Sequence, residues 1–407
     1  MSPCPRLPDF LPRLRDGVIE FPVHHMRGGT STGLVILDRL APAAIALREE
    51  LLRHLMGLPL AGTRAGNRQI TGLGRGPATS NKVFFADLDE QGRIVSTLAQ
   101  LAAETAAVDW SVNCGNMSAA LPLWALDTGL LSRPAGPGAF TPVIRNTNTG
   151  VLTASRMVFG ADGLPVTTEI PGVDGAFAAV DLALGDPVGS KTGKLLPTGN
   201  RTDRCAGVEV SCVDVAVPMV IARAEDFGRS VHEPIGDLDS DPALMARLRA
   251  VWVAAGLAMG LRGRDGQPLS AEALARSETI PKLCLVGKPT AGGHIAARYF
   301  TPQQGHRSMA VSGGCCLAAA ALIPGTVAHA EAAGLAAPGA EARPIAVGIE
   351  NPAGILGASI TAAAAPDGLR LTEAAYVRST QILLRGHVPL PRASAALTAA
   401  LLAGRPG

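Results

Sequence analysis

Apolar residues follow two different spacings in the first part of the chain. The stretch VIEFPVHHM (18–26) has the character of a strand and leads through the turn RGGTSTG into a second strand, LVIL, which predicts a hairpin. The stretch PAAIALREELLRHLMG has helical spacing and stops at Gly57, where a glycine can end a helix. A glycine-rich loop, TGLGRGPATSN, then precedes the predicted strand KVFFADL.

Most of the remaining chain is typical of strands separated by turn residues, as in the region 142–182. A helix is predicted over 242–260, and two alanine-rich apolar helices are predicted, one after Cys114 as far as Gly129 and one after Gly314. Runs of strands with one apolar helix per half favour an α+β fold with antiparallel sheets, each sheet wrapping its helix. Further strands are predicted in GVEVSCVDVAVPMVIARA (two strands), KLCLVG, HIAARYF, RPIAVGIEN, ASITAAAA and LRLTEAAYVRSTQILLRG.

The starts of the two alanine-rich helices resemble each other. Cys114 lies between Asn113 and Gly115 where the first helix should begin, so unpaired N–H groups and the helix dipole would stabilise its thiolate form. Ser312, Gly313 and Gly314 open the second apolar run in the same way. Two such helix starts predict a two-fold pseudo-repeat enclosing one anionic ligand, and therefore an enzyme.

Composition excludes several classes of protein. The 407 residues are 47% hydrophobic and 17% charged, which indicates a packed globular protein with room for two or three domains. The net charge of +2 and the aromatic content of 3% give no basic or stacking surface for nucleic acid. No apolar run is long enough to span a bilayer, and the N-terminus shows no export signal. We therefore expect a cytoplasmic protein without a membrane partner.

No metal site is predicted from the histidines and cysteines. The eight histidines form no H-x-x-x-H or H-x-H pattern, and C-x-x-C does not occur. The odd number of cysteines, seven, argues against a secreted disulfide framework. The acidic run Asp237-Leu-Asp239-Ser-Asp241 precedes Pro242, so we interpret it as the cap of a helix.

Five motifs resemble one known family when taken together and in order. MRGGTSTG, the lysine of TSNKV, VDWSVNCGNMSAA, LLPTGN and HRSMAVSGG…IPGTVA are similar to motifs of the PrpF-type isomerases, over about residues 21 to 385. That family includes 2-methylaconitate cis-trans isomerase, 4-oxalomesaconate tautomerase and methylitaconate isomerase. The resemblance implies a cofactor-independent isomerase with the diaminopimelate epimerase-like fold. In that fold, two pseudo-symmetric domains each wrap a mostly antiparallel sheet around a central helix, with the active site in the cleft between them.

The resemblance also implies domain limits and partners. We expect an N-terminal domain over 18–186, completed by strands near 373–387, and a C-terminal domain over 187–372. The implied ligand is a small unsaturated polycarboxylate, and a homodimer is a possible assembly.

Carried over by the motifs, the family's catalytic lysine falls on Lys82 and its active-site cysteine on Cys114. Two positions depart from the family pattern, because Thr32 replaces the lysine of RGGTSKG and Thr71 replaces the aspartate of QIDG. The arm of the substrate that those charges would recognise can therefore differ here. The expected substrate-binding residues are Arg27, Thr30, Ser31, Ser80, Gly115, Asn116, Asn200, Arg298, His306, Ser312, Gly313 and Gly314.

The implied reaction moves a proton across an allylic or keto-enol system of an unsaturated tri- or dicarboxylate. Lys82 can act as base only when neutral, which requires a pKa lowered by burial or by nearby cations. Arg27 and Arg298 are candidates for such cations and also for binding the carboxylate groups of the substrate. Cys114 either transfers a proton or lines the pocket. Two other functions stay open: a Cys–His thiol hydrolase or acyltransferase using Cys114 and His306, and a non-catalytic partner of an aconitase-like dehydratase.

Overall fold

The computed structural model describes residues 10–263, 266–277, 279–365 and 368–403, and divides the chain into two compact units. Unit 1 comprises residues 1–169, 175–182 and 378–407, and unit 2 comprises residues 170–174 and 183–377. Two strands, β11 (Phe177–Gly185) and β20 (Gly368–Pro389), contribute residues to both units. Cys4 lies outside the described residues.

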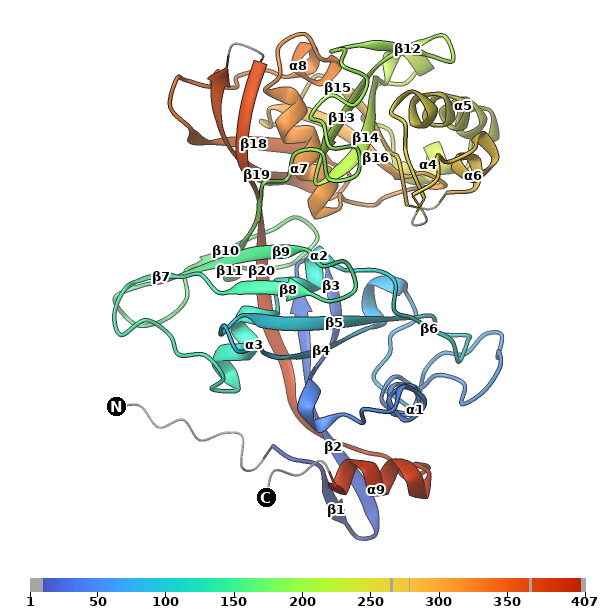
Figure 1. Cartoon of the computed structure of the whole chain (residues 1–407), viewed down its shortest axis with the longest axis vertical. Coiled ribbons are helices and arrows are strands. Elements are labelled where there is room, and N and C mark those ends of the chain that lie inside the picture. The colour runs from blue at the N-terminus through green and yellow to red at the C-terminus, as the bar shows by residue number, and fades with distance from the viewer. Residues whose placement is uncertain (1–9, 264–265, 278, 366–367, 404–407) are drawn as a thin grey trace. The chain divides into compact units, whose positions relative to one another are not determined.

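Unit 1 is built on a mixed sheet (Figure 1). Besides its parts of β11 and β20, its elements in chain order are β1 (Arg13–Arg15), β2 (Val18–Gly28), β3 (Ser31–Leu37), η1 (Asp38–Leu40), α1 (Ile45–Met56), η2 (Ala78–Ser80), β4 (Lys82–Leu88), β5 (Ile94–Leu101), β6 (Val108–Asp109), α2 (Gly115–Ser118), α3 (Leu121–Asp127), β7 (Gly138–Phe140), β8 (Val143–Asn146), β9 (Leu152–Phe159), β10 (Thr167–Thr168) and α9 (Ala395–Ala403).

The predicted hairpin and the first predicted helix are confirmed. Strands β2 and β3 pair antiparallel from His24–Val35 to Gly28–Ser31. Helix α1 ends at Gly57, which takes the left-handed conformation with φ 68° and donates its N–H to Arg53 and His54. Apolar side chains of α1, α3 and α9 share one buried core with β2 to β5, so the helices hold the sheet that carries the predicted site residues.

The alanine-rich helix predicted after Cys114 is interrupted. It forms α2 and, after Ala119 and Ala120, α3. Pro122 lies in the first turn of α3, where its missing N–H is tolerated, but it cannot continue the hydrogen-bond ladder of α2. Helix α2 contacts β2 and β3. The approach is close, because a Cβ atom at Gly28 would lie 2.5 Å from the carbonyl oxygen of Asn116.

Unit 2 contains its own set of paired strands and the longest helix of the described residues (Figure 1). Its remaining elements are β12 (Asp203–Cys205), β13 (Val208–Val215), β14 (Val217–Arg223), η3 (Glu225–Phe227), α4 (Ile235–Asp239), α5 (Pro242–Ala258), α6 (Ala271–Arg276), β15 (Lys282–Gly287), β16 (Ile295–Thr301), β17 (Gln304–Gly305), α7 (Val311–Ala321), α8 (Val327–Glu331), β18 (Arg343–Asn351) and β19 (Gly354–Ala365).

The acidic run before α5 caps that helix, as predicted. Asp241 is the N-cap, and its carboxylate accepts the N–H groups of Ala243 and Leu244. Helix α7 is almost entirely buried and contacts β13, β14, β18 and β19. A sheet wrapped around an apolar helix is therefore confirmed in this unit.

The two units share one order of strand pairings. In unit 1, β2–β3 is antiparallel, β3–β4 parallel, β4–β5 antiparallel, β5–β8 parallel and β8–β9 antiparallel. In unit 2, β13–β14, β14–β15, β15–β16, β16–β18 and β18–β19 repeat that sequence. The chain therefore carries an internal structural repeat, in which α2 and α3 correspond to α7, and β4 corresponds to β15.

The expectation of mostly antiparallel sheets is confirmed. The parallel pairs just named are the exceptions, because helices connect those strands. Strand β5, the partner of β4, was not among the predicted strands although its burial alternates. No helix within the described residues is both long and apolar enough to cross a membrane.

Candidate active site

Lys82 is the first residue of β4, and its side chain is buried. Burial lowers the pKa of Lys82, and a thiolate at Cys114 opposes that shift by favouring the ammonium form. The structure therefore brings the two predicted catalytic residues within electrostatic reach of each other. Burial is the cause of the lowered pKa, so the shift requires no contribution from Arg27.

Cys114 is the N-cap of α2, as the sequence predicts. Its sulfur lies 4.0 Å from the hydroxyl oxygen of Ser31, and its N–H donates to Oδ1 of Asn113 over 2.7 Å. The cysteine is partly exposed, whereas Cys205, Cys212, Cys284, Cys315 and Cys316 are buried. Cys114 is thus the accessible thiol among the described cysteines.

Asn116 stands beside the turn that joins β2 and β3. Its Oδ1 accepts the Nε–H of Arg378 over 2.6 Å, and its Nδ2 lies 3.5 Å from the hydroxyl oxygen of Thr30. A Cβ atom at Gly29 would lie 2.5 Å from Oδ1 of Asn116, and Gly29 has φ 54°. A side chain at Gly29 would therefore disturb both the turn and the helix start.

Arg27 carries two unsatisfied donors in a buried position. Its Nη1 donates to the carbonyl oxygens of Gly29 and Ser379 and to the hydroxyl of Ser379, whereas Nε and Nη2 have no partner. The guanidinium lies 4.6 Å from the ring centre of Phe177, and burial lowers its pKa. Nε and Nη2 form the side of a guanidinium that binds a carboxylate with two hydrogen bonds.

Strand pairing separates Arg27 from Lys82 across the sheet. Gly33 is the neighbour of Met26 in β2 and packs against Lys82, whereas Arg27 is opposite Thr32. Since neighbouring positions along a strand point to opposite faces, Arg27 and Lys82 project from opposite faces near the turn between β2 and β3. The structure does not support the expectation that Arg27 supplies a cationic field to Lys82.

The remaining predicted residues of unit 1 lie near these groups along the chain. Ser31 is buried at the start of β3, Gly115 is the first residue of α2, and Ser80 ends the 3-10 turn before Lys82. Of the two departures from the family motifs, Thr32 has a buried hydroxyl without a partner and Thr71 is exposed.

Three predicted residues of unit 2 are held by contacts within that unit. Arg298, in β16, is buried and donates to the carbonyl oxygens of Glu233 and Ala297, and burial lowers its pKa. Asn200 is exposed and donates to Asp203 over 2.8 Å. The Nδ1 atom of His306 accepts the N–H of Ser308 over 3.0 Å.

Gly313 and Gly314 lie within the second alanine-rich helix and do not precede it. Helix α7 begins at Val311, so Ser312, Gly313 and Gly314 lie in its first turn, and the N–H of Gly314 already donates to Ala310. A Cβ atom at Gly313 would overlap the ring of Tyr299, and one at Gly314 would overlap the ring of Tyr376. These glycines therefore make room for two tyrosines that pack against the helix, and their contact with the substrate stays a prediction.

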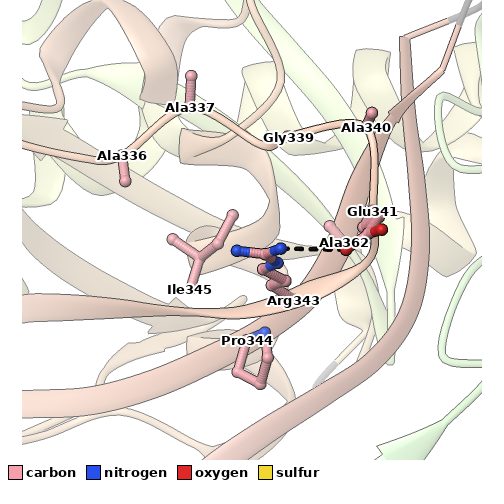
Figure 2. A pocket seen from close by; sticks show the side chains of 9 residues that line it. All are labelled: Ala336, Ala337, Gly339, Ala340, Glu341, Arg343, Pro344, Ile345 and Ala362. Atoms are coloured by element: carbon pink, nitrogen blue, oxygen red, sulfur yellow. Dashed lines mark hydrogen bonds and ion pairs between the residues drawn. The ribbon is translucent and has the colours of Figure 1, made fainter.

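Two shallow cavities are lined by none of the predicted site residues. One, of about 580 Å³, lies in unit 2 between the loop at Ala336–Ala340 and the strand start at Arg343 (Figure 2), where Arg343 pairs with Glu341. The other, of about 640 Å³, lies beside the loops of unit 1 at 66–68, 75–76 and 102–104. In the described part of the chain, no three His, Cys, Asp or Glu side chains form a group that could hold a metal ion.

Sequence reasoning missed several buried polar residues around the site. Arg378 holds Asn116, and Gln69 and Asn81 form a buried amide pair directly before Lys82. Lys282 is the first residue of β15, the strand that corresponds to β4, and burial lowers its pKa to about 8. The glutamine of QITG and the asparagine of TSNKV were the available signals, whereas Arg378 and Lys282 stand in no recognisable motif.

Comparison with known proteins gives consistent matches along the chain. Residues 18–391 match the model of the PrpF protein family. A 4-oxalomesaconate tautomerase of Pseudomonas putida is 37% identical over 77% of this chain and 82% of its own length. A (4E)-oxalomesaconate Delta-isomerase of Novosphingobium is 30% identical over 93% of this chain and 99% of its own.

A solved structure supports the same assignment. The crystal structure of a methylitaconate-delta-isomerase has a TM-score of 0.75 and 25% identity, and the match covers 94% of this chain and 97% of the other. These matches confirm the α+β fold and favour an isomerase over the hydrolase and the non-catalytic partner. The chain belongs to the PrpF family, and its enzyme class is that of an isomerase.

Proposed function

We propose that this isomerase moves a proton across an allylic or keto-enol system of an unsaturated di- or tricarboxylate, without a cofactor. The observation that carries the proposal is the placement of Lys82 and Cys114. A buried lysine at the start of β4 lies within electrostatic reach of the one described thiol that is accessible, at the N-cap of α2.

Lys82 is the proposed base. Burial disfavours its ammonium form, so a neutral amine is available at a lower pH than for an exposed lysine. The neutral Nζ takes a proton from the acidic carbon, and the electron pair of the broken C–H bond enters the conjugated system as a dienolate. Protonation at the far end of that system completes the isomerisation with no net change in protons.

Cys114 is the proposed second proton-transfer group. Its thiol can deliver the proton at the far end, after which the thiolate recovers a proton from the Lys82 ammonium. In the other arrangement, Lys82 returns the proton itself and Cys114 lines the pocket. Replacement of Cys114 by serine and by alanine distinguishes the two, because serine keeps a proton at this position.

Arg27 is the proposed contact for a carboxylate group of the substrate. Its Nε and Nη2 are buried without partners, which is costly for a cation unless an anion binds there. Because Arg27 projects from the opposite face of the sheet, we propose that it acts near the turn between β2 and β3, where Thr30 and Asn116 also lie. Those two side chains offer further donors to the ligand.

The first substrate to test is 4-oxalomesaconate, because the relative with 37% identity is named for that acid. Thr32 and Thr71, which replace charged residues of the family motifs, leave room for a related acid. The panel should therefore include 2-methylaconitate, aconitate and methylitaconate.

The deciding experiment is proton exchange in D₂O with the purified protein and no added cofactor. We expect one acid of the panel to gain deuterium and to isomerise, with no fragments released. Release of fragments would indicate a hydrolase. Absence of exchange for every acid, with a folded protein and a wide pH range, would overturn the proposal.

A further inference from the structure

The loop before Lys82 is closed by two side-chain amides that bind each other. Nε2 of Gln69 donates to Oδ1 of Asn81 over 2.8 Å, and Nδ2 of Asn81 donates to Oε1 of Gln69 over 3.0 Å. Both residues are buried, Asn81 with 0% and Gln69 with 1% of its surface exposed. A reciprocal amide pair away from water loses both bonds if either partner is replaced.

The other hydrogen-bonding positions of this pair are also filled. Gln69 Nε2 donates to the carbonyl oxygen of Met56, and Gln69 Oε1 accepts the N–H of Gly76. Asn81 Nδ2 donates to the carbonyl oxygen of Gly76 over 2.7 Å. The pair therefore ties the end of α1, the glycine-rich loop and the start of β4 together. A fully satisfied buried network of this kind fixes one arrangement of the groups it joins.

The backbone around the pair is shaped to accommodate it. Gln69 has a positive φ of 55°, which is unfavourable for a glutamine and persists only where its surroundings hold it. A Cβ atom at Gly74 would overlap the Gln69 amide. Gln69 is the first residue of the QITG motif, and it is this residue, not the exposed Thr71, that makes the contacts.

Asn81 and Lys82 are adjacent, and residues of β5 and β3 contact their backbone. The carbonyl oxygen of Asn81 accepts the N–H of Leu101 and the Nε2–H of Gln100, each over 3.0 Å. Lys82 then pairs with Gln100 in β5, and Gly33 packs closely against it from β3. The direction in which the Lys82 side chain leaves the backbone is therefore set by groups that the amide pair anchors.

We propose that Gln69 and Asn81 are positioning residues that hold the Lys82 amine in its buried place beside Cys114. This inference rests on the proposed role of Lys82 as base. Asn81 directly precedes Lys82, and we assign the amide pair a positioning role and no part in proton transfer. Without it, the glycine-rich loop is released and the flexible lysine side chain can turn toward water.

The test measures Lys82 directly, so it does not depend on knowing the substrate. Competitive acetylation with acetic anhydride across a pH series, read by mass spectrometry, reports the pKa of each lysine. In the unaltered protein the pKa of Lys82 should lie below 10.5, since burial lowers it. In Asn81→Ala and Gln69→Ala it should move toward 10.5, and kcat should fall about 10- to 100-fold with an alkaline shift of the pH–rate profile.

Asn146→Ala is the matched control. Asn146 is another buried asparagine of unit 1, which bonds to Ser96 and Asn148. Its loss should lower stability but leave the Lys82 pKa and the pH–rate profile unchanged. Gln69→Asn combined with Asn81→Gln restores an amide at both positions and should recover part of the lost kcat.

The outcomes separate this inference from the proposed function. If Lys82→Met keeps its activity, the role of Lys82 as base is wrong. If Lys82→Met is inactive but a folded Gln69→Ala or Asn81→Ala keeps the native Lys82 pKa and kcat, the positioning role is wrong. Should Asn81→Ala fail to fold, Gln69→Ala and Gln69→Glu decide the question in the same assay.

Discussion

Arg378 and Asn116 are 262 residues apart in the chain and share a hydrogen bond of 2.6 Å. Arg378, in β20, is 2% exposed, and Asn116 follows Cys114 in the first turn of α2. The bond therefore joins the last long strand to the helix start that carries the candidate thiol. No motif in the sequence connects these two positions.

A double-mutant cycle should show that Arg378 and Asn116 are coupled. A hydrogen bond to a charged group contributes about 1.5–3 kcal/mol, so we expect a coupling free energy of unfolding above about 1 kcal/mol between Arg378→Met and Asn116→Ala. Urea unfolding of the two single variants and the double variant measures it. Asn116→Ala combined with Arg93→Ala is the control, since Arg93 pairs with Asp89 instead. A coupling no larger than in that control would contradict the assignment.

Lys82→Met should remove turnover and increase stability. General base catalysis contributes at least about 10²-fold, so kcat should fall by that factor or more. Because the pKa of Lys82 is lowered below 10.5 in the folded protein, the unfolded chain binds more protons between those two values. The buried amine therefore costs stability below the folded pKa, and this cost disappears as the pH rises through 10.5.

The measurements are a pH–rate profile and urea unfolding at several pH values. The rate of the unaltered protein should rise with pH as Lys82 loses its proton. The stability gain of Lys82→Met should be largest at neutral pH and should vanish in strongly alkaline solution. More than about a tenth of the original kcat in Lys82→Met would show that another group is the base.

Much of the local structure could be predicted because its causes are local. The helical spacing before Gly57, the cap at Asp241 and the strand patterns around Lys82 and Ser31 depend on residues close in sequence. Ordered motifs also located Lys82 and Cys114, which the structure brings near each other. The interruption by Pro122 was readable from the proline, although the apolar run suggested one continuous helix.

Long-range packing could not be predicted from spacing. The glycines at the start of α7 were predicted as anion-binding positions, and only the structure shows that they also make room for Tyr299 and Tyr376. The side chains of Arg27 and Lys82 project from opposite faces of the sheet. This could not be predicted without the register of β2 with β3. The bond from Arg378 to Asn116 likewise depends on how β20 pairs with β2.

Cys114 should react with iodoacetamide faster than the five buried cysteines described here. It is partly exposed at the N-cap of α2, whereas the other five described thiols are buried. Mass-spectrometric mapping at neutral pH gives the rate for each cysteine. The active acid of the panel should slow labelling of Cys114 and leave the others unchanged. Labelling of Cys114 at the rate of Cys315 would contradict its accessibility.

His25 should make the protein acid-sensitive. Burial and the nearby Arg75 lower the pKa of His25 from 6.5 to about 4. The folded protein therefore keeps His25 neutral while the unfolded chain takes up a proton below pH 6.5, so stability falls with pH from 6.5 to about 4. At pH 4.5 this single group should cost about 2.5 kcal/mol relative to neutral pH.

Urea unfolding at pH 7.5 and 4.5 tests this expectation for His25. His25→Leu should lose less stability than the unaltered protein between the two pH values, by about 2.5 kcal/mol. Arg75→Gln should lose slightly less stability than the unaltered protein between the two pH values, because removing the cation raises the pKa of His25. An equal loss in His25→Leu and the unaltered protein would rule out His25 as the sensitive group.

Gly314→Val should destabilise unit 2 by steric overlap within its core. A Cβ atom at Gly314 would overlap Cε2 and Cζ of Tyr376, which is fully buried. Overpacking of this kind costs about 1–3 kcal/mol, which exceeds the helix propensity gained by replacing a glycine.

Gly236→Ala is the matched control, because Gly236 lies in α4 with no atom within 4 Å of a built Cβ. Thermal unfolding should show a lower Tm for Gly314→Val and an unchanged or slightly higher Tm for Gly236→Ala. Combining Gly314→Ala with Tyr376→Leu should recover part of the loss seen in Gly314→Ala, since the smaller side chain leaves room for the methyl group. A Gly314→Val protein with the original Tm but weakened binding of the acid would contradict this steric argument and favour the prediction that Gly314 contacts the ligand.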